Sequence, residues 1–490
     1  ATGVRCSAPG KVLIVGGYLI LDRENKGLVI STTARFHSSI QYVEQEATEA
    51  KQTNLSDPLS VSILSPQFSS KNQIQILEDD NGCIRLSEEA EQTPVYIRLC
   101  LLLGLGLARA YGGEKVIPTK PFQIMLQADN DFYSQQQLME SRNLPKSMES
   151  YSKLQKFEPV HGSLSEIRKT GLGSSATLVS SLLASLFIFL GAIEPKNGEI
   201  SSADKSYLHN IAQVVHCAAQ GKVGSGFDIS TAVFGSQSYS RFSKSIIEGV
   251  LTDIDALTTN PNSYGKVIEQ IHSLCADNDK WDYSHTLFQL PPHLSMVLGD
   301  VNAGANTPSM VSKLLQWKRE NPEKAQQLWK EQGMLNDSVG ELFSKLQSKY
   351  DNNAEDYITT LNACSNLPHS QWESQTAIDS QIVSVILELH KVFIDIRKNL
   401  KQMGVFAGVP IEPDEQTRLI DSTIQLPGVI TAAVPGAGGF DALFAVVIDT
   451  ADSRIQSTLE KHWVEWTELS VLPQLVREDP QGGIHLELSL

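Results

Sequence analysis

The pattern of apolar and polar positions gives the first part of the chain a strand-rich character. Residues 4–16 and 28–43 are apolar or alternating, which predicts two strands. Residues 44–60 and 65–82 are polar and rich in turn residues, so we expect loops between edge strands there. Residues 99–110 are almost entirely apolar and predict a buried helix.

A polar region from about 244 to 284 divides the chain. It follows a predicted helix at 203–220 and precedes a new apolar strand at 294–298. A chain of 490 residues is long enough for two domains with their own cores. We therefore expect one domain at 1–245 and a second at 246–490.

The second half is richer in predicted helices. One helix begins at Pro322, a long one covers 377–403 and stops at Gly404, and Pro413 opens another. Before these, residues 129–168 form a long insertion of mixed charge. Insertions of that length inside compact domains are more often functional than idle.

Charge and cysteine content exclude several classes of protein. The formal net charge is −16, from 40 basic and 56 acidic residues, whereas sequence-independent nucleic-acid binding needs a basic face. An anionic substrate must therefore be held by a local positive pocket. The six cysteines are scattered without a C-x-x-C pair, which favours a reducing compartment and argues against a disulfide framework or a zinc ribbon. No targeting segment or membrane span is visible in the sequence, so we expect a cytoplasmic protein, with a peroxisomal location left open.

Residues 169–177, Lys-Thr-Gly-Leu-Gly-Ser-Ser-Ala-Thr, stand directly before an apolar helical run. Glycines let backbone N–H groups face a phosphate, and the N-terminus of a helix adds partial positive charge. A glycine turn with an ordinary N-cap explains this segment equally well. The pattern lacks the lysine of the common phosphate loop, so the positive charge has to come from elsewhere.

Two more glycine-rich segments lie near the ends of the chain. Residues 7–19 contain Lys11 between a Pro-Gly turn and a strand of β-branched residues, which is a rigid place for a cation. Residues 434–442 contain Gly438 and precede a predicted strand at 443–448. Each segment alone is weak evidence, and the three together are much stronger.

Together the three segments resemble the motifs of the galactokinase, homoserine kinase, mevalonate kinase and phosphomevalonate kinase (GHMP) superfamily. Within it, the chain is most similar to the phosphomevalonate kinases of fungi and plants. The segments that carry this second resemblance are 16–19, 130–134, 220–228, 299–301, 306–311 and 409–413. They span nearly the whole chain.

The resemblance implies an α+β fold, the GHMP kinase fold. Its N-terminal α/β domain is like domain 2 of ribosomal protein S5, its C-terminal α+β domain is ferredoxin-like, and the active site lies in the cleft between them. It implies ATP-dependent phosphorylation of (R)-5-phosphomevalonate to (R)-5-diphosphomevalonate in the mevalonate pathway, with Mg²⁺ as cofactor. Another kinase of the superfamily, acting on mevalonate or a sugar, is the alternative. A catalytically dead metabolite sensor of the same fold is a weaker one.

The resemblance also assigns residues to the nucleotide. Those placed around ATP are Lys169, Gly171, Leu172, Gly173, Ser174, Ser175 and Ala176. Ser175 is expected to hold the magnesium ion, and Ser174 to cap the helix or contact a phosphate, with the reverse assignment open.

Lys11 and Asp228 are the expected catalytic pair. In mevalonate kinases the aspartate of this motif is the base, but a phosphomonoester acceptor is already anionic at pH 7, because its second pKa is about 6. We therefore expect Asp228 to orient Lys11 and the acceptor rather than remove a proton. A plain helix N-cap is its alternative role.

Two departures from the mevalonate kinase pattern lower the local negative charge. His216 and Cys217 stand where an acidic metal ligand is expected, and Gly17 and Tyr18 replace an early acidic residue. Both changes suit an acceptor that carries its own phosphate, since two phosphoryl groups must approach each other. They leave the second metal ligand open.

The acceptor should meet cations and small polar groups. Lys222, in the turn before Asp228, is the first candidate cation, followed by Arg241, Lys169 and Arg397; each is alternatively a solvated surface charge. The remaining candidate contacts are Gly17, Tyr18, Ser225, Asn306, Ser309 and Gly438. We expect small-molecule partners only, neither nucleic acid nor membrane, and a monomer or weak homodimer.

Overall fold

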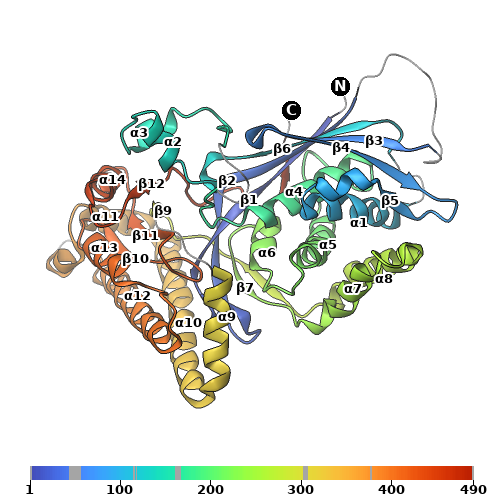
Figure 1. Cartoon of the computed structure of the whole chain (residues 1–490). Coiled ribbons are helices and arrows are strands. Elements are labelled where there is room, and N and C mark those ends of the chain that lie inside the picture. The colour runs from blue at the N-terminus through green and yellow to red at the C-terminus, as the bar shows by residue number, and fades with distance from the viewer. Residues whose placement is uncertain are drawn as a thin grey trace.

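Two β-sheets, each covered by helices, make up the fold (Figure 1). The structure is a computed structural model that describes residues 3–43, 57–113, 116, 118–160, 167–301, 307–375 and 378–487, without the side chains of 307 and 308. The first sheet has the order β13-β1-β2-β6-β3-β4-β5, with β7 paired to β2 and β8. All its pairs are antiparallel except β3 with β6.

The strands of this sheet come from both ends of the chain. They are β1 (Gly3–Val15), β2 (Gly27–Tyr42), β3 (Leu59–Ser65), β4 (Ser70–Glu78), β5 (Ile84–Leu86), β6 (Phe122–Ala128), β7 (Gln237–Ser240), β8 (Ser284–Leu287) and β13 (His485–Leu486). The helices that belong to this half are α1 (Val95–Gly112), α4 (Ser174–Phe189), α5 (Ser202–Gln220), α6 (Phe227–Phe234), α7 (Ser245–Ala256) and α8 (Tyr264–Cys275). The insertion contributes α2 (Gln136–Ser141) and α3 (Met148–Ser152).

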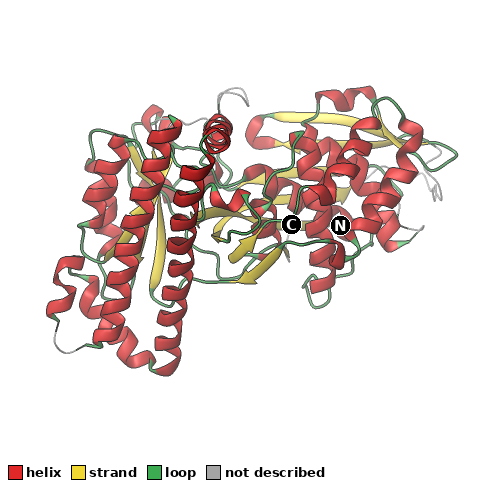
Figure 2. Cartoon of the chain, turned by 90° about the horizontal axis from the view of Figure 1, so that it is seen from below, coloured by secondary structure: helices red, strands yellow, loops and turns green. Residues whose placement is uncertain are grey.

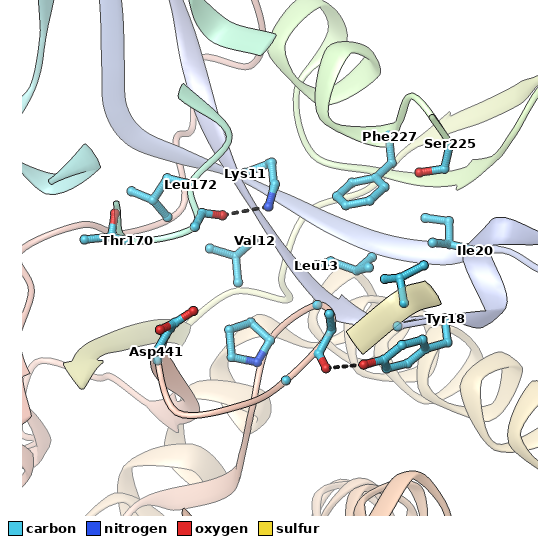
Figure 3. Close-up of a pocket in the computed structure, with 18 of the residues that line it drawn as sticks. Lys11, Val12, Leu13, Tyr18, Ile20, Thr170, Leu172, Ser225, Phe227 and Asp441 are labelled. Atoms are coloured by element: carbon cyan, nitrogen blue, oxygen red, sulfur yellow. Dashed lines mark hydrogen bonds between the residues drawn. The ribbon is translucent and has the colours of Figure 1, made fainter. Parts of the chain in front are cut away.

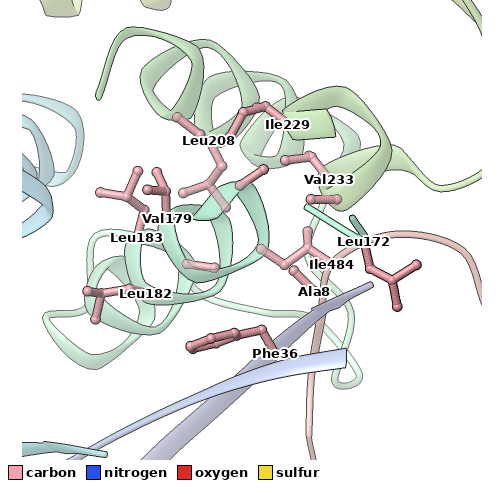
Figure 4. Packing of buried hydrophobic residues seen from close by; sticks show 14 of the residues in the cluster. Ala8, Phe36, Leu172, Val179, Leu182, Leu183, Leu208, Ile229, Val233 and Ile484 are labelled. Carbon is pink, nitrogen blue, oxygen red and sulfur yellow. The ribbon is translucent and has the colours of Figure 1, made fainter. Parts of the chain in front are cut away.

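Helix α4 is the centre of the first core. It packs on β1 and β2 and contacts α1, α5 and α6. Figure 4 shows Leu182 and Leu183 of α4, Leu208 of α5 and Ile229 of α6 gathered above the strands. Because α4 is apolar on every side, burial against several neighbours fixes the position of its N-terminus.

The second sheet is antiparallel, in the order β10-β11-β9-β12. Its strands are β9 (Leu294–Val301), β10 (Val429–Ala433), β11 (Ala442–Ile448) and β12 (Val471–Pro473). The helices of this half are α9 (Thr307–Glu320), α10 (Pro322–Asn352), α11 (Ala354–Ser365), α12 (Ser380–Ala407), α13 (Asp414–Ile424) and α14 (Ile455–Glu465). The long helices α10 and α12 pack along each other, and Figure 2 shows these long helices beside the sheet.

The chain passes between the two sheets more than once. Strand β8, beyond residue 245, pairs with β7 in the first sheet, and β13 pairs with β1. The backbone before β13 also runs along β2, where Thr33 donates to Arg477 and Asp479 donates to Ser31. The division at residue 245 stays a prediction, and these pairings show that the first sheet draws strands from both sides of it.

Several predicted elements are confirmed and two are wrong. Helices over 99–110 and 203–220 and the strand at 294–298 are present. Residues 65–82 were expected to be a loop, but β4 occupies half of them. In β4 the buried Ile74 and Ile76 alternate with polar residues that face solvent, so the polar composition hides a period of two.

Helix α12 continues through Gly404, so the expected end of the helix there is wrong. A Cβ at Gly404 would overlap the carbonyl oxygen of Val409, which shows that this glycine allows a close approach of the chain. The helix ends at Gly408, whose φ of 67° gives the left-handed C-cap.

Helix α1 is long and apolar enough to cross a membrane by length and composition. Its buried residues, however, belong to the first core, and the helix contacts α4, α5 and α8. A buried helix of a folded core meets the same length and composition criteria.

Candidate active site

Strand β1 brings Lys11 to the glycine loop 171–173. The Lys11 backbone N–H donates to the carbonyl of Leu172 at 2.9 Å, and its Nζ donates to the carbonyl of Gly171 at 2.6 Å (Figure 3). Strand and loop are thereby joined by main chain and side chain together. The cation missing from the loop itself is supplied by this strand.

The first turn of α6 places Asp228 beside the same loop. Gly173 is the N-cap of α4 with φ 77°, and a Cβ there would lie 3.2 Å from Lys11 Cε and 3.6 Å from Asp228 Cβ. A side chain at this position would thus press on Lys11 and touch Asp228. Lys11, Gly173 and Asp228, which are distant in sequence, meet at one point.

Burial and charge act in opposite directions on Lys11. Burial lowers the pKa of its ammonium group, whereas the neighbouring Asp228 carboxylate raises it, and the net shift is downward. The Phe227 ring lies 5.4 Å from Nζ and offers its face to the cation. Asp228 is therefore the acidic partner that favours the charged form of Lys11.

Ser175, in the first turn of α4, has an imidazole as its partner. Its Oγ lies 3.0 Å from Nε2 of His216, which comes from α5. Burial lowers the pKa of His216, partly opposed by Asp228, so the ring is neutral at pH 7. The residue in place of the expected acidic ligand thus contacts Ser175 and brings no negative charge.

The glycine loop and α4 fit a nucleotide phosphate with a magnesium ion. Gly171 has φ 81° and no neighbour within 4 Å of a Cβ position, so its outer side is open. Among the described residues there is no group of three or more His, Cys, Asp or Glu side chains that could hold a metal ion. Magnesium at phosphate sites needs few protein ligands, because phosphate oxygens and water supply the rest. The Ser175 hydroxyl and the nearby Asp228 carboxylate match that requirement.

A cavity of about 210 Å³ opens beside Lys11, between the two halves of the molecule (Figure 3). Its lining combines an apolar wall with a few polar groups: Lys11, Val12, Leu13, Gly17, Tyr18, Ile20, Leu21, Thr170, Gly171, Leu172, Ser225, Phe227, Leu298, Val311, Pro435, Gly436, Ala437, Gly438, Asp441, Ala442 and Gln474. Lys11 alone among these described residues carries a positive charge. The cavity suits a small, partly apolar anion.

The third glycine loop closes one side of the cavity. Gly436 donates its N–H to the carbonyl of Leu13 at 3.0 Å, and the Tyr18 hydroxyl donates to the carbonyl of Ala437 at 2.6 Å. A Cβ at Gly17 would overlap the Gly436 carbonyl. The N-terminal glycine-rich segment and the third glycine loop are therefore hydrogen-bonded to each other beside the cavity.

The four other candidate cations are not among the residues that line the cavity. Lys169 and Lys222 are exposed and do not line the cavity. Arg241 is 3% exposed, and its guanidinium donates to three backbone carbonyls, those of Leu21, Gly224 and Phe242. Arg397 is held by the carboxylates of Glu412 and Asp421.

Two candidate contacts, Asn306 and Ser309, lie at or just before the start of α9 in sequence. Ser309 lies in the first turn of α9 and is not among the lining residues. Asn306 lies outside the described residues. Val311 of α9 reaches the cavity.

The insertion at 129–160 supports the glycine loop from behind. The backbones of Ser134 and Thr170 pair with those of Arg168 and Phe132, so the strand leading into the loop is held in place. Asp300, from β9, accepts hydrogen bonds from the Ser134 hydroxyl at 2.5 Å and from Arg168 at 3.0 Å. The insertion thus links the loop to the second sheet.

Three polar residues of α5 lie near the site, and of these only His216 was expected from the sequence. Gln213, His216 and Gln220 are three to seven positions apart, which places them on one face of a helix. His216 contacts Ser175, and Gln213 donates to the carbonyl of Gly226 at 2.8 Å. The spacing of Gln213 and Gln220 from His216 is the signal that would have identified them.

Known proteins resemble the chain over its whole length. No family model matches the sequence. A relative from Arabidopsis thaliana described as peroxisomal phosphomevalonate kinase is 35% identical, covering 98% of this chain and 95% of its own. The phosphomevalonate kinase of Candida albicans is 31% identical, with 98% and 99% covered.

Two solved structures share the fold. The Lin0012 protein from Listeria innocua superimposes with a TM-score of 0.60 at 15% identity, covering 100% of both chains. Streptococcus pneumoniae phosphomevalonate kinase, in complex with phosphomevalonate and AMPPNP, gives 0.53 at 16% identity, covering 97% and 99%. The expected α+β class and GHMP kinase fold are confirmed. With full-length relatives above 30% identity, the chain belongs to the phosphomevalonate kinase family and is a phosphotransferase.

Proposed function

We propose that the protein transfers the γ-phosphoryl group of ATP to (R)-5-phosphomevalonate, which yields (R)-5-diphosphomevalonate and ADP. The observation that carries this proposal is the position of Lys11. Its ammonium group lies where the glycine loop, Asp228 and the cavity meet, so it can neutralise charge between donor and acceptor. Phosphoryl transfer depends mainly on positioning and on such neutralisation.

ATP is assigned to the glycine loop and the N-terminus of α4. Backbone N–H groups of residues 171–176 would hold the phosphates, with Lys169 at the rim. Ser175 would hold magnesium, whose role is to neutralise phosphate charge, and the contact with His216 keeps its hydroxyl in place.

The acceptor is assigned to the cavity. Gly17, Tyr18, Ser225 and Gly438 form its polar and backbone lining, while apolar side chains exclude water. Lys222, exposed in the turn before Ser225, is the further cation proposed for the acceptor phosphate. Its replacement by Met should raise KM for the acceptor and leave KM for ATP unchanged.

Asp228 is proposed to orient Lys11 and the acceptor. The acceptor phosphate loses its second proton at a pKa of about 6, so a base is needed only below that pH. If Asp228 orients, Asp228→Asn should lower kcat by the same factor from pH 6 to pH 8. A loss that shrinks as pH rises would instead identify Asp228 as a base.

The same variant should change the alkaline side of the pH profile. Asp228 raises the pKa of Lys11 against burial, so its removal lowers that pKa further. Lys11 is active when charged, and activity is lost as pH rises through its pKa. The alkaline loss of activity in Asp228→Asn should therefore begin at a lower pH than in the wild type.

A coupled assay of ADP release tests the proposed function directly. Phosphomevalonate, mevalonate and galactose are offered in parallel, with ATP and Mg²⁺. We expect turnover with phosphomevalonate at least tenfold above the other two. Preference for mevalonate or galactose would overturn the proposal, and ATP binding without ADP release on any acceptor would support a metabolite sensor.

We propose a monomer or weak homodimer, to be tested by light scattering at several concentrations. All six cysteines are buried and unpaired, which suits the reducing cytoplasm. A peroxisomal location is the alternative, because the plant relative is described as peroxisomal.

A further inference from the structure

The turn before Asp228 is held from behind by three buried side chains. Three consecutive carbonyl oxygens each accept a hydrogen bond from a different donor: Gly224 from Arg241 at 2.9 Å, Ser225 from the Tyr239 hydroxyl at 2.7 Å, and Gly226 from Gln213 at 2.8 Å. The donors come from α5, β7 and the chain just after β7. All three are buried, so water does not compete for these bonds.

Gln213 is itself fixed by a hydrogen-bonded histidine. Nδ1 of His209 lies 2.9 Å from Oδ1 of Asn210, which accepts, so the ring carries its proton on Nδ1. Burial lowers the pKa of His209 to about 3, and the ring stays neutral. Its Nε2 then accepts from the amide nitrogen of Gln213 at 3.1 Å. The Gln213 amide nitrogen thus lies between two acceptors, His209 Nε2 and the Gly226 carbonyl. This fixes which end of the amide group is the nitrogen.

Gly226 brings this contact next to the catalytic aspartate. It is the N-cap of α6 with φ 79°, two residues before Asp228, and a Cβ there would overlap the Gln213 amide. The backbone therefore lies directly against Gln213. A shift of this amide would move the first turn of α6.

We propose that Gln213 is a positioning residue for phosphoryl transfer: by holding the Gly226 carbonyl it aims Asp228 at Lys11. Tyr239 and Arg241 serve the same turn through the two preceding carbonyls. This inference rests on the proposed function, and it gives Arg241 a role other than the substrate contact expected from sequence. Gln213 is not among the described residues that line the cavity.

Gln213→Met tests the inference against a matched control. Gln67, 2% exposed, also donates to a backbone carbonyl, that of Ala128 at 2.8 Å, and accepts from the same residue, but it lies behind β6. Both Met variants lose a buried amide and should show similar falls in melting temperature. Only Gln213→Met should lower kcat, by about 10–100-fold, since displacement of a catalytic group by about 1 Å costs this much.

Comparing the change in kcat with the change in KM for ATP distinguishes a positioning role from general destabilisation. KM for ATP should stay within about twofold in Gln213→Met, because ATP is held by the glycine loop and α4 rather than by this turn. Tyr239→Phe, which removes one hydroxyl and keeps the ring, should lower kcat by about 3–10-fold. It provides the test if Gln213→Met does not fold.

The kcat values of the variants decide the inference. Equal kcat in the Gln213 and Gln67 variants, or in Tyr239→Phe and the wild type if Gln213→Met is unfolded, overturns the inference. Failure of the wild type on phosphomevalonate overturns the proposed function alone, and the same variants are then compared on whichever acceptor the panel identifies. A fall in kcat confined to the turn variants supports the positioning role.

Discussion

Two of the glycine loops each contain a glycine with nearly the same φ angle, but the two glycines have opposite surroundings. Gly171 and Gly438 have φ values of 81° and 77°. Nothing lies within 4 Å of a Cβ at Gly171, whereas a Cβ at Gly438 would overlap the carbonyl oxygen of Ile411. The first loop is therefore open at Gly171, and the second is packed against the protein at Gly438; we call them the open loop and the packed loop after these two glycines.

This difference separates ligand binding from support. An open glycine leaves room for a phosphate to approach the backbone, while a packed glycine lets two chain segments touch. Two residues of the N-terminal segment donate hydrogen bonds to these loops: Lys11 to the loop with Gly171, and Tyr18 to the loop with Gly438. Changes at the open loop should therefore alter kinetics, and changes at the packed loop should alter stability first.

Lys11→Met should have the largest effect, because it removes the cation that the open loop lacks. We expect kcat to fall by about 10²–10³-fold, the usual loss when a group that stabilises transition-state charge is removed. The coupled ADP assay measures it. Lys71→Met, which alters an exposed lysine of β4, should leave kcat unchanged, and equal losses in both variants would contradict the assignment.

Gly438→Ala should mainly destabilise the protein. The added methyl group meets the Ile411 backbone, which cannot move easily, and the positive φ adds strain. We expect the free energy of unfolding to fall by about 2–5 kcal/mol in denaturant titrations. Gly340→Ala, where a Cβ meets nothing, is the control and should cost nothing. A stable Gly438→Ala would show that the loop is not packed as described.

Gly171→Ala should show the reverse behaviour. The methyl group meets no protein atom but occupies the open side of the loop, so KM for ATP should rise about tenfold, equivalent to about 1.4 kcal/mol. Gly113→Ala also places a methyl group at a positive φ, 97°, in open surroundings, but after α1 and outside the glycine loop. It should lose comparable stability without a change in KM. Unchanged ATP binding in Gly171→Ala would contradict the phosphate assignment.

The sequence predicts the open loop better than the packed one. Glycines, small hydroxyl residues and an apolar helix signal a helix N-terminus, because these are local requirements of the backbone. The contact between Gly438 and Ile411 depends on how distant segments pack, which local pattern does not encode. The same holds for β4, whose two buried isoleucines are outnumbered by polar neighbours.

Side-chain partners across elements were the hardest to foresee. Lys222 and Arg241 were the first two candidate cations for the acceptor, yet Arg241 is buried among carbonyls and Lys222 is exposed. Charge alone favours both as substrate ligands. What separates them is the burial of each side chain and the direction it takes, which only the fold decides. Charge gives no indication of Gln213, because its amide is uncharged; only its spacing on α5 does.

Tyr18→Phe should have the smallest effect of the series. It removes the hydroxyl that donates to Ala437 and leaves that carbonyl without this donor beside the cavity. Stability should fall by about 1 kcal/mol. Because the packed loop lines the cavity, KM for the acceptor should rise about three- to fivefold while KM for ATP stays constant.

Tyr264→Phe is the matched control for this last change. Tyr264 is also buried, and its hydroxyl donates to the carbonyl of Leu102 at 2.6 Å, between α8 and α1. The two variants lose the same chemistry at different places, so their stabilities should fall alike. A rise in acceptor KM confined to Tyr18→Phe would show that the packed loop, although it serves stability first, also shapes the acceptor cavity. The same KM in both variants would restrict that loop to a purely supporting role.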